Sequence, residues 1–272
     1  MPRPRSSGPH ARKALGQHFL RDTGVLADIV AAVHQPAGGV VVEIGAGTGQ
    51  LTEALLDAGN TIVALEIEER LLRHLHQRFA ETPRLQLVQG DAREVDFGQL
   101  VPSDTPFVVV GNLPYFAANP IIRHLLEGQP KPTEAVFMVQ REVGRELAAK
   151  PGHLSLLSIS VQVYAEVFSL FDVSPLAFDP PPAVYSSVVR LAIRERPLVP
   201  FERIHAFFAL VSKTFRNPRK QVHNALARET GLTVEEAAQV LSETAIDPMR
   251  RAETLTIAEW LSLLDAVERI HA

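Results

Sequence analysis

The sequence predicts an α/β protein: a mainly parallel sheet covered by helices, followed by a small all-helical region. Two observations support this class. Runs rich in β-branched residues alternate with helical patterns of about ten residues as far as Gln140, which is typical of βαβ units. Beyond a proline-flanked linker at residues 195–200, the periodicity is helical throughout. The 272 residues, 46% of them hydrophobic, suffice for one large domain and a small second one.

Each element follows from a local pattern. The expected strands are residues 40–44, 61–67, 85–91, 107–112 and 134–140, and the helices between them are 53–58, 68–79 and 120–126. Residues 154–163 predict a helix, and 164–174 and 186–194 predict two late strands that close the sheet edge as an antiparallel pair. The C-terminal helices are expected at 201–215, 222–227, 233–242 and 256–270. Thr233, with Glu236 three residues later, indicates a capping box.

Composition excludes several classes of site. The chain has no cysteine, so disulfides, thiolate zinc sites and cysteine nucleophiles are excluded. Its histidines are scattered, and we expect no metal site. No apolar run approaches the roughly 18 residues that a membrane span needs, and the first twenty residues contain no signal-peptide core. We therefore expect a soluble, cytoplasmic protein.

The net charge of −4 conceals two basic segments. Residues 1–21 carry five basic residues and no acid, and residues 201–228 carry six basic residues against one acid. The rest of the chain is therefore strongly acidic. Localised basic segments indicate a footprint for a polyanion such as RNA, because Lys and Arg contacts to phosphates supply most non-specific affinity. Charge alone leaves open a solvated surface and a disordered tail.

The first three strand ends carry residues suited to an adenosine. Gly45, Gly47 and Gly49 allow a sharp turn and close approach of a ligand, although a tight βα turn without a ligand also fits. Glu66, about 20 residues on, is placed to accept hydrogen bonds from ribose hydroxyls. Asp91 can accept one from an exocyclic amine, or else cap a helix. Ligands of such sheets bind at the carboxyl ends of the strands, where these residues fall.

The fourth strand end is the segment "NLPY". Asn112 offers a carbonyl oxygen, Pro114 stiffens the turn, and Tyr115 supplies a ring on which a base can stack. Two acceptors held near an exocyclic amine would orient its N–H bonds and aim its lone pair outward. The alternative is a plain turn followed by a core tyrosine.

Together, "EIGAGTG", Glu66, "GDA" and "NLPY" resemble S-adenosylmethionine-dependent methyltransferases that act on exocyclic amines. More narrowly, "KALGQHFL", "FDPPPAVYS" and "AIDPMRRAETLT" resemble the small-subunit ribosomal RNA adenine dimethyltransferases, from about Lys13 to Leu264. The resemblance implies a Rossmann-like seven-stranded sheet, a C-terminal helical domain and S-adenosyl-L-methionine as methyl donor. It also implies that two adjacent adenosines in the 3′-terminal hairpin of 16S rRNA become N6,N6-dimethyladenosine.

The same resemblance implies the site residues. Cofactor contacts are expected at Gln17, His18, Leu20, Glu43, Gly45, Gly47, Glu66, Ile67, Asp91, Ala92 and Asn112. Catalytic roles are expected for Asn112, Leu113, Pro114, Tyr115 and Phe178, with Tyr115 and Phe178 enclosing the flipped base. RNA contacts are expected at Arg12, Lys13, Arg216, Arg219 and Lys220. We expect a basic arm at 1–21, a catalytic domain at 22–195, a helical RNA-binding domain at 200–272, and a monomer acting on the small ribosomal subunit or its precursor.

Two positions depart from the family pattern. His18 stands where asparagine is usual, which puts that cofactor contact in doubt. Pro218, in "FRNPRK", takes the place of the first of two usual arginines, and a proline there would break or cap a helix.

Other functions remain open at this point. The large-subunit adenine methyltransferases that confer macrolide resistance share the Asn-x-Pro-aromatic element. DNA adenine methyltransferases usually carry Asp-Pro-Pro-Tyr instead. A non-catalytic assembly factor that binds small subunits is compatible with the basic segments. The glycine spacing disfavours a nicotinamide oxidoreductase.

Overall fold

The chain divides into two compact units. The computed structural model describes Pro9, residues 17–217 and residues 220–271. One unit comprises the described residues up to Arg145 together with Val167–Ile193, and the other comprises Glu146–Glu166 and the described residues from Arg194 onward. Residues 146–166, expected within a catalytic domain at 22–195, thus group with the C-terminal helices.

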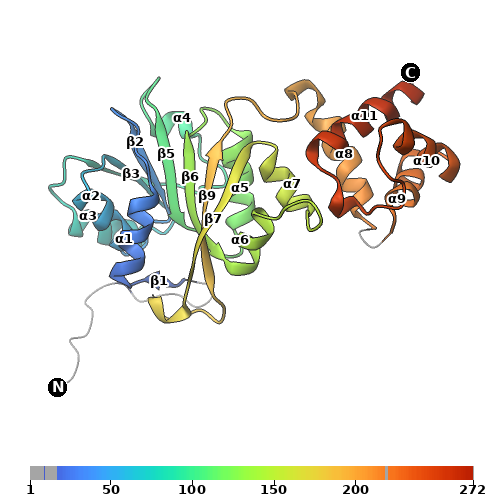
Figure 1. The fold of residues 1–272 in the computed structure, drawn as a ribbon. Helices are drawn as coiled ribbons and strands as arrows, with labels where there is room; N and C mark the ends of the chain where they lie inside the picture. Colours follow the sequence, from blue (N-terminus) through green and yellow to red (C-terminus); the bar gives the residue numbers. More distant parts are fainter. Residues whose placement is uncertain (1–8, 10–16, 218–219, 272) are drawn as a thin grey trace. The chain divides into compact units, whose positions relative to one another are not determined.

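The first unit is built on a seven-stranded sheet with the order β4-β3-β2-β5-β6-β9-β7 (Figure 1). The strands are β2 (Val40–Ile44), β3 (Ile62–Glu66), β4 (Leu85–Gln89), β5 (Phe107–Asn112), β6 (Glu134–Gln140), β7 (Ala165–Val173) and β9 (Ser186–Ile193). Strands β2 to β6 pair in parallel, and β9 joins β6 antiparallel. The predicted α/β class and the predicted strands are confirmed. Because β3 and β5 flank β2, the strand order reverses at β2, and a ligand crevice is expected at its carboxyl end.

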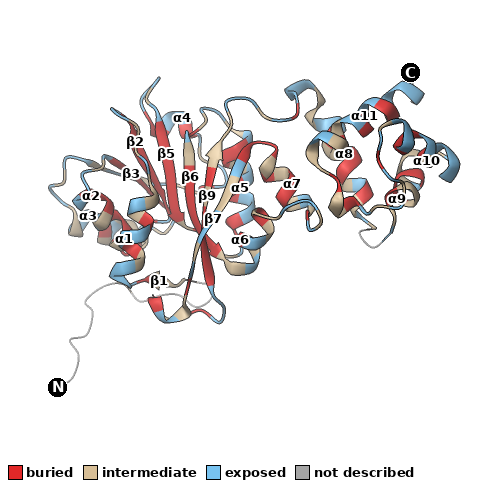
Figure 2. Ribbon diagram, in the orientation of Figure 1, coloured by how far each residue is buried: buried red, intermediate tan, exposed pale blue. Residues whose placement is uncertain are grey.

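Helices cover the sheet, and its central strands are buried. The helices are α1 (Thr23–Ala32), α2 (Gln50–Asp57), α3 (Glu69–Arg78), α4 (Phe97–Leu100), α5 (Ala118–Glu127) and α6 (Arg141–Leu147), the last of which crosses the boundary between the units. Every residue of β2 and β3 is buried, as Figure 2 shows in red, which explains their continuous Val, Ile and Leu content. Helix α1 was not predicted, although Asp22 caps it by accepting the N–H groups of Gly24 and Val25.

A second, two-stranded sheet joins distant segments. Strand β1 (Phe19–Leu20) pairs antiparallel with β8 (Phe178–Asp179), and Leu20 lies opposite Phe178. The short helix η2 (Pro175–Ala177) precedes β8, and the carbonyl of Ala177 accepts the N–H of Arg21 at 2.8 Å. This sheet was not predicted. It fixes the segment that precedes α1 against the hydrophobic core, which includes Leu20 and Phe178.

The second unit is helical, as predicted for its C-terminal part. It contains α7 (Leu156–Gln162), η3 (Phe201–Arg203), α8 (Ile204–Phe215), α9 (Val222–Thr230), α10 (Val234–Glu243), η4 (Ala252–Thr254) and α11 (Ile257–His271). Its core includes the fully buried side chains of Phe207, Leu226 and Trp260. The capping box of α10 is confirmed, because Thr233 and Glu236 exchange both hydrogen bonds.

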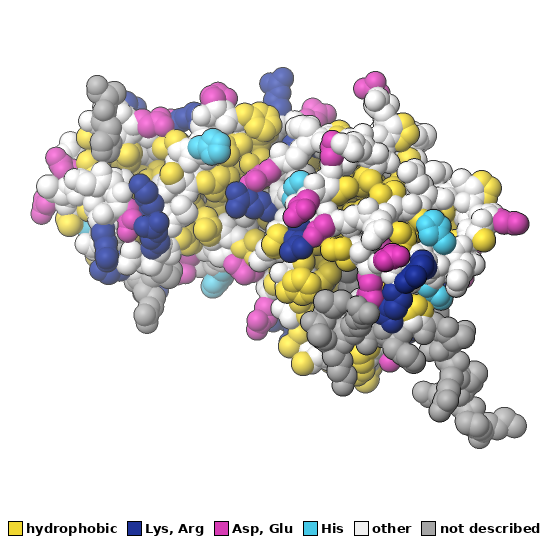
Figure 3. Space-filling view, turned by 180° about the vertical axis from the view of Figure 1, so that it is seen from behind, with side chains coloured by type: hydrophobic (Ala, Val, Ile, Leu, Met, Phe, Trp, Pro, Cys, Tyr) yellow, Lys and Arg dark blue, Asp and Glu magenta, His cyan; other side chains and the backbone are white. Residues whose placement is uncertain are grey.

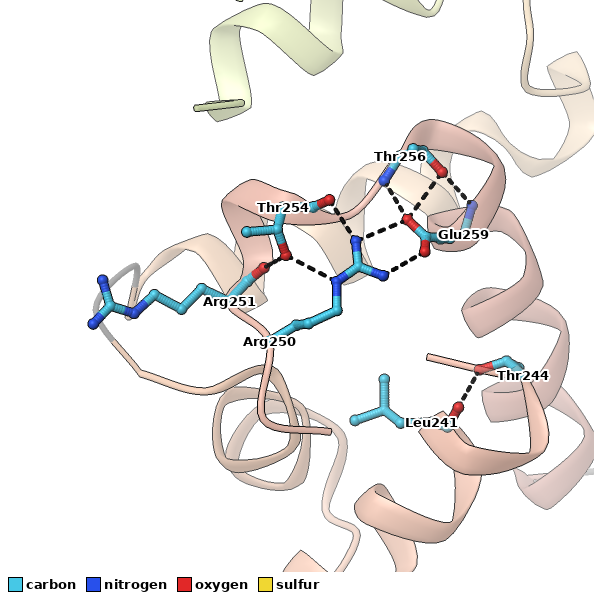
Figure 4. Close-up of polar contacts among 7 residues, drawn as sticks. All are labelled: Leu241, Thr244, Arg250, Arg251, Thr254, Thr256 and Glu259. Atoms are coloured by element: carbon cyan, nitrogen blue, oxygen red, sulfur yellow. Dashed lines mark hydrogen bonds and ion pairs between the residues drawn. The ribbon is translucent and has the colours of Figure 1, made fainter. Parts of the chain in front are cut away.

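The segment "DPMRRAETLT" connects α10 to α11 through a polar network around Arg250 (Figure 4). The Arg250 guanidinium donates to Glu259 Oε1 at 2.5 Å and to the Thr254 carbonyl at 2.5 Å. Glu259 also accepts the N–H of Thr256 at 2.7 Å, which caps α11, and the Arg250 hydrogen bond lowers the pKa of Glu259. Arg251 extends away from this network. Arg250 therefore stabilises the connection between α10 and α11, whereas the Arg251 side chain faces outward.

Within residues 17–217 and 220–271, no helix combines the length and apolar character of a membrane span.

Candidate cofactor and substrate site

The loop between β2 and α2 has the conformation that its glycines allow. Gly45 and Gly47 have φ values of +71° and +60°, in the left-handed region that side chains rarely adopt. A Cβ atom on Gly47 would lie 3.3 Å from the ring of Phe19. The Gly45 N–H donates to the Leu65 carbonyl at 2.8 Å, which ties the loop to β3. The loop is therefore fixed close to the end of β3, where Glu66 stands.

Glu66 is buried and held by main-chain donors. Its carboxylate accepts the N–H of Gly47 at 2.9 Å and the N–H of Glu68 at 2.9 Å. Burial raises the pKa of Glu66, and the two N–H groups oppose that shift because they favour the charged form. Each oxygen retains acceptor capacity, so the carboxylate can still accept hydrogen bonds from hydroxyl groups.

The strand ends meet around a cavity of about 350 Å³. The predicted residues that line it are Gln17, His18, Gly45, Gly47, Glu66, Ile67, Asn112, Leu113, Pro114 and Tyr115. A smaller cavity of about 90 Å³ adjoins it, lined by Asp91 and Ala92. The two cavities share Gly45, Ile67 and Pro114 among their walls. Residues predicted from four separate strand ends thus lie around two adjoining cavities.

Asn112, at the end of β5, is oriented by His18, the residue before β1. Its amide nitrogen donates to the His18 carbonyl at 3.1 Å, so its side-chain oxygen lies on the opposite side of the amide. Gly111 precedes it, and a Cβ atom there would lie 2.6 Å from the Ile44 carbonyl oxygen. Only glycine lets β5 approach β2 this closely. The Leu113 N–H continues the β6 pairing by donating to Met138 at 3.1 Å.

His18 and Tyr115 form one wall of the cavity. Their rings stack with centroids 6.0 Å apart and planes inclined by 29°. His18 Nδ1 lies 2.8 Å from the Pro180 carbonyl, which can only accept, so Nδ1 carries the proton. The Tyr115 hydroxyl shares a hydrogen bond of 2.9 Å with Ser186, and burial raises the pKa of Tyr115. Histidine at position 18 thus links β1, the proline-rich loop and the "NLPY" turn.

Three predicted site residues do not line either cavity. Leu20 and Phe178 pack in the hydrophobic core, and Glu43 is buried beneath the glycine loop. Phe178 is only 5% exposed, because the β1–β8 pairing turns its ring inward. A stacking role for Phe178 stays a prediction, and it requires the ring to leave the position described.

Asp91 lies at the cavity wall, as predicted, but its carboxylate is paired with Arg93. Its carboxylate accepts the N–H of Arg93 at 2.9 Å and pairs with the Arg93 guanidinium at 2.5 Å. These bonds with Arg93 lower the pKa of Asp91. Contact with an adenine amine would therefore use the remaining acceptor capacity of the carboxylate.

The cavity walls also include residues that the sequence analysis missed. They are Phe19, Glu68, Leu71, Arg93 and Phe116. Glu68 accepts a hydrogen bond from the Gln17 side chain at 2.8 Å, which secures the N-terminal end of the wall. Phe116 is 67% exposed and lines both cavities. Its position directly after Tyr115 could have identified Phe116 as a site residue from the sequence.

The predicted RNA contacts are only partly within the described residues. Arg12, Lys13, Arg219 and Pro218 lie outside them. Arg216 is exposed and lies 3.5 Å from Glu229. Lys220 borders a polar pocket with Gln221, Asn224, Met249 and Arg251. On the face seen in Figure 3, basic side chains are interspersed with acidic ones. The RNA-binding assignment of these residues stays a prediction.

Across residues 17–217 and 220–271, no group of three or more His, Asp or Glu side chains is arranged to hold a metal ion.

Glu43 leads to a pH-dependent prediction. It is 1% exposed, accepts a hydrogen bond from Thr52 at 2.6 Å, and burial raises its pKa to about 7. Between about pH 4.5 and 7 the folded chain keeps a proton that the unfolded chain releases, so folding stability falls as the pH rises through this window. Relative to Glu43→Gln, we expect wild type to lose on the order of 3 kcal/mol across it.

Urea unfolding of both proteins across that pH window measures the effect. Glu69→Gln, on the exposed surface of α3, controls for the loss of a negative charge. Parallel stability curves for wild type and Glu43→Gln would contradict a raised pKa in the folded state.

The fold and the site together define a class of protein. A parallel sheet with a glycine loop, a buried acid at the end of β3 and an Asn-Leu-Pro-Tyr turn at the end of β5 is the arrangement of a Rossmann-like methyltransferase. The chain belongs to the ribosomal RNA adenine dimethylase family, whose sequence model matches residues 8–268.

Individual relatives agree with this family. The chain is 39% identical to the ribosomal RNA small subunit methyltransferase A of Pseudomonas aeruginosa, over 96% of each chain. It is 37% identical to the protein of the same name from Dehalococcoides mccartyi, over 93% of this chain and 87% of that one.

Two solved structures share the fold at lower identity. A dimethyladenosine transferase from Plasmodium falciparum matches with a TM-score of 0.77 at 24% identity, over 93% of this chain and 98% of that one. The 23S rRNA methyltransferase ErmE matches with a TM-score of 0.73 at 24% identity, over 92% and 99%. At this identity the likeness shows the fold alone.

Proposed function

We propose that this rRNA adenine N6,N6-dimethyltransferase acts on two adjacent adenosines in the 3′-terminal hairpin of 16S rRNA, with S-adenosyl-L-methionine as methyl donor. The observation that carries the proposal is the meeting of four strand ends around two adjoining cavities, with Asn112 beside the glycine loop. We expect the protein to act as a monomer in the cytoplasm, on the small ribosomal subunit or its precursor.

The residues of the two cavities suit the donor. The Glu66 carboxylate, fixed by two N–H groups, would accept the ribose hydroxyls. The smaller cavity, with Asp91 and Ala92, offers a carboxylate acceptor and an apolar surface for adenine. Gly45 and Gly47 leave space where a Cβ atom would crowd the approach. S-adenosyl-L-methionine supplies an electrophilic methyl group on a sulfonium and leaves as neutral S-adenosyl-L-homocysteine.

Asn112 and Leu113 would position the target amine. The Asn112 side-chain oxygen and the main-chain carbonyl of this turn can accept hydrogen bonds from the two N6–H groups, which aims the nitrogen lone pair at the donor. No general base is needed before attack, because the N6 proton becomes acidic only as charge builds on nitrogen. Alignment at about 3–3.5 Å can contribute roughly 7–11 kcal/mol to lowering the barrier. The stacked side chain of Tyr115 would hold the base, which must be unpaired or flipped to enter.

Mass spectrometry of RNA tests the proposal. After incubation with the protein and S-adenosyl-L-methionine, we expect N6,N6-dimethyladenosine in small-subunit rRNA and in fragments from its 3′ end. Large-subunit rRNA serves as the comparison. Modification confined to large-subunit rRNA would assign the chain to the macrolide-resistance activity. Binding of small subunits without methyl transfer would instead favour an assembly factor.

A further inference from the structure

A second aromatic side chain, Tyr185, directly precedes a residue that contacts Tyr115 of the cavity wall, and it is paired with an arginine. The guanidinium of Arg141 lies over the ring of Tyr185, with its carbon 4.8 Å from the ring centroid. The Arg141 N–H also donates to the Tyr185 carbonyl at 3.0 Å. Tyr185 nevertheless remains 45% exposed. The pair therefore presents both a ring surface and a cation to solvent.

The position of this pair is fixed by its chain neighbours. Ser186, the next residue after Tyr185, bonds the hydroxyl of Tyr115 at 2.9 Å. Gln140, the residue before Arg141, lies opposite Ser186 in the β6–β9 pairing. Adjacent residues have Cα atoms about 3.8 Å apart. Tyr185 and Arg141 are thus each one residue removed from contacts that adjoin the cavity wall.

An exposed ring with a guanidinium suits a nucleotide. A base can stack on the ring, and a guanidinium pairs with phosphate through a planar set of donors. Arg145, four residues along α6, lies on the same helical side as Arg141 and is exposed, 4.0 Å from Asp172. An RNA strand that inserts one base into the cavity must lay its neighbouring nucleotides on this rim.

We infer that Tyr185 and Arg141 bind the nucleotide next to the target adenosine, with its base stacked on the Tyr185 ring and its phosphate paired with Arg141. This subsite rests on the proposed function, because it receives the same RNA strand. It would fix which unpaired adenosines can present N6 to Asn112.

The chain contains a matched control pair. Arg190 lies over the ring of Phe168 at the same 4.8 Å. Arg190 pairs with Val136 in the β6–β9 ladder, four residues along the strand from Ser186. Neither residue lines the cavity. Removal of the Phe168 ring therefore tests the loss of an arginine–aromatic contact in the same unit without touching the proposed subsite.

Steady-state kinetics with small-subunit particles separates RNA binding from chemistry. For Tyr185→Ala we expect the KM for RNA to rise about tenfold, as for loss of one stacked base, with kcat unchanged. Tyr185→Phe should restore wild-type KM, because the ring is kept. Arg141→Ala should raise KM and reduce the salt dependence of binding by about one phosphate contact. Phe168→Ala should leave KM unchanged. An unchanged KM for Tyr185→Ala, or equal losses for Tyr185→Ala and Phe168→Ala, would overturn the inference.

A binding measurement decides the subsite without relying on methyl transfer. Trp260 is the single tryptophan and is fully buried, so it gives a constant background. Emission added by Tyr185→Trp should be quenched by a single-stranded RNA with two adjacent adenosines, and emission added by Phe168→Trp should not. Quenching without any methylation by wild type would overturn the proposed function and keep the subsite. Methylation without quenching would do the reverse.

Discussion

Asn112→Ala is expected to lower kcat for methyl transfer by about 10²–10³-fold, the loss typical of removing one preorganised group that stabilises developing charge. The variant lacks the Asn112 side-chain oxygen, which would otherwise accept a hydrogen bond from N6 as positive charge builds on that nitrogen. Affinity for S-adenosyl-L-methionine should change little, because Glu66 and the glycine loop remain. Single-turnover methylation and calorimetric binding of the donor measure the two effects separately.

The control for this variant must lose a similar side-chain hydrogen bond, so that both variants lose a similar free energy of unfolding. Asn112 donates its amide to the His18 carbonyl at 3.1 Å, and Asn60 donates its amide to the Leu55 carbonyl at 2.9 Å. Asn60→Ala removes a similar hydrogen bond away from the cavity, so it should lose a comparable amount of stability and keep full activity. Methylation by Asn112→Ala at near the wild-type rate would refute the assigned role.

Glu66→Ala should raise the Kd for S-adenosyl-L-methionine by at least about 100-fold. Hydrogen bonds to a charged group contribute roughly 1.5–3 kcal/mol each, and two ribose hydroxyls would lose their acceptor. The N–H groups of Gly47 and Glu68 would also lose their partner, which loosens the glycine loop. Glu66→Gln keeps one acceptor oxygen and should fall between wild type and Glu66→Ala.

Isothermal titration with the donor measures this series. Glu69→Ala, three residues along and exposed on α3, provides the control for charge. Thermal unfolding of each variant shows whether the fold is retained. If Glu66→Ala bound S-adenosyl-L-methionine with a Kd within a few-fold of wild type, Glu66 would not hold the ribose. The donor would then have to lie in the cavity in a different orientation.

The sequence was sufficient for the sheet and for the residues at its strand ends. Parallel strands end at one edge, so Gly45, Glu66, Asp91 and Asn112 were expected to lie together once their strands were recognised. This inference needs only local patterns of β-branched residues and the rule of chain order.

Contacts between distant short segments were not predictable in this way. Strands β1 and β8 have two residues each and lie about 160 positions apart, so neither has a periodicity that could identify it. Their pairing turns Phe178 into the core, whereas the family resemblance had implied a ring that encloses the flipped base. The Asp91–Arg93 pair, by contrast, lies two residues apart and had a local signal that was overlooked.

The two residues before β1 connect both parts of the proposed site. Gln17 bonds Glu68, beside the proposed donor position, whereas His18 accepts the Asn112 amide and stacks on Tyr115, beside the proposed position of the target base. A shift of this segment that one ligand favours would therefore change the binding affinity of the other ligand. Thermodynamic reciprocity then requires donor and RNA to change each other's affinity by the same factor. With donor and base placed as proposed, exchange of spent donor between successive methyl transfers would be coupled to how firmly the half-modified adenosine is held.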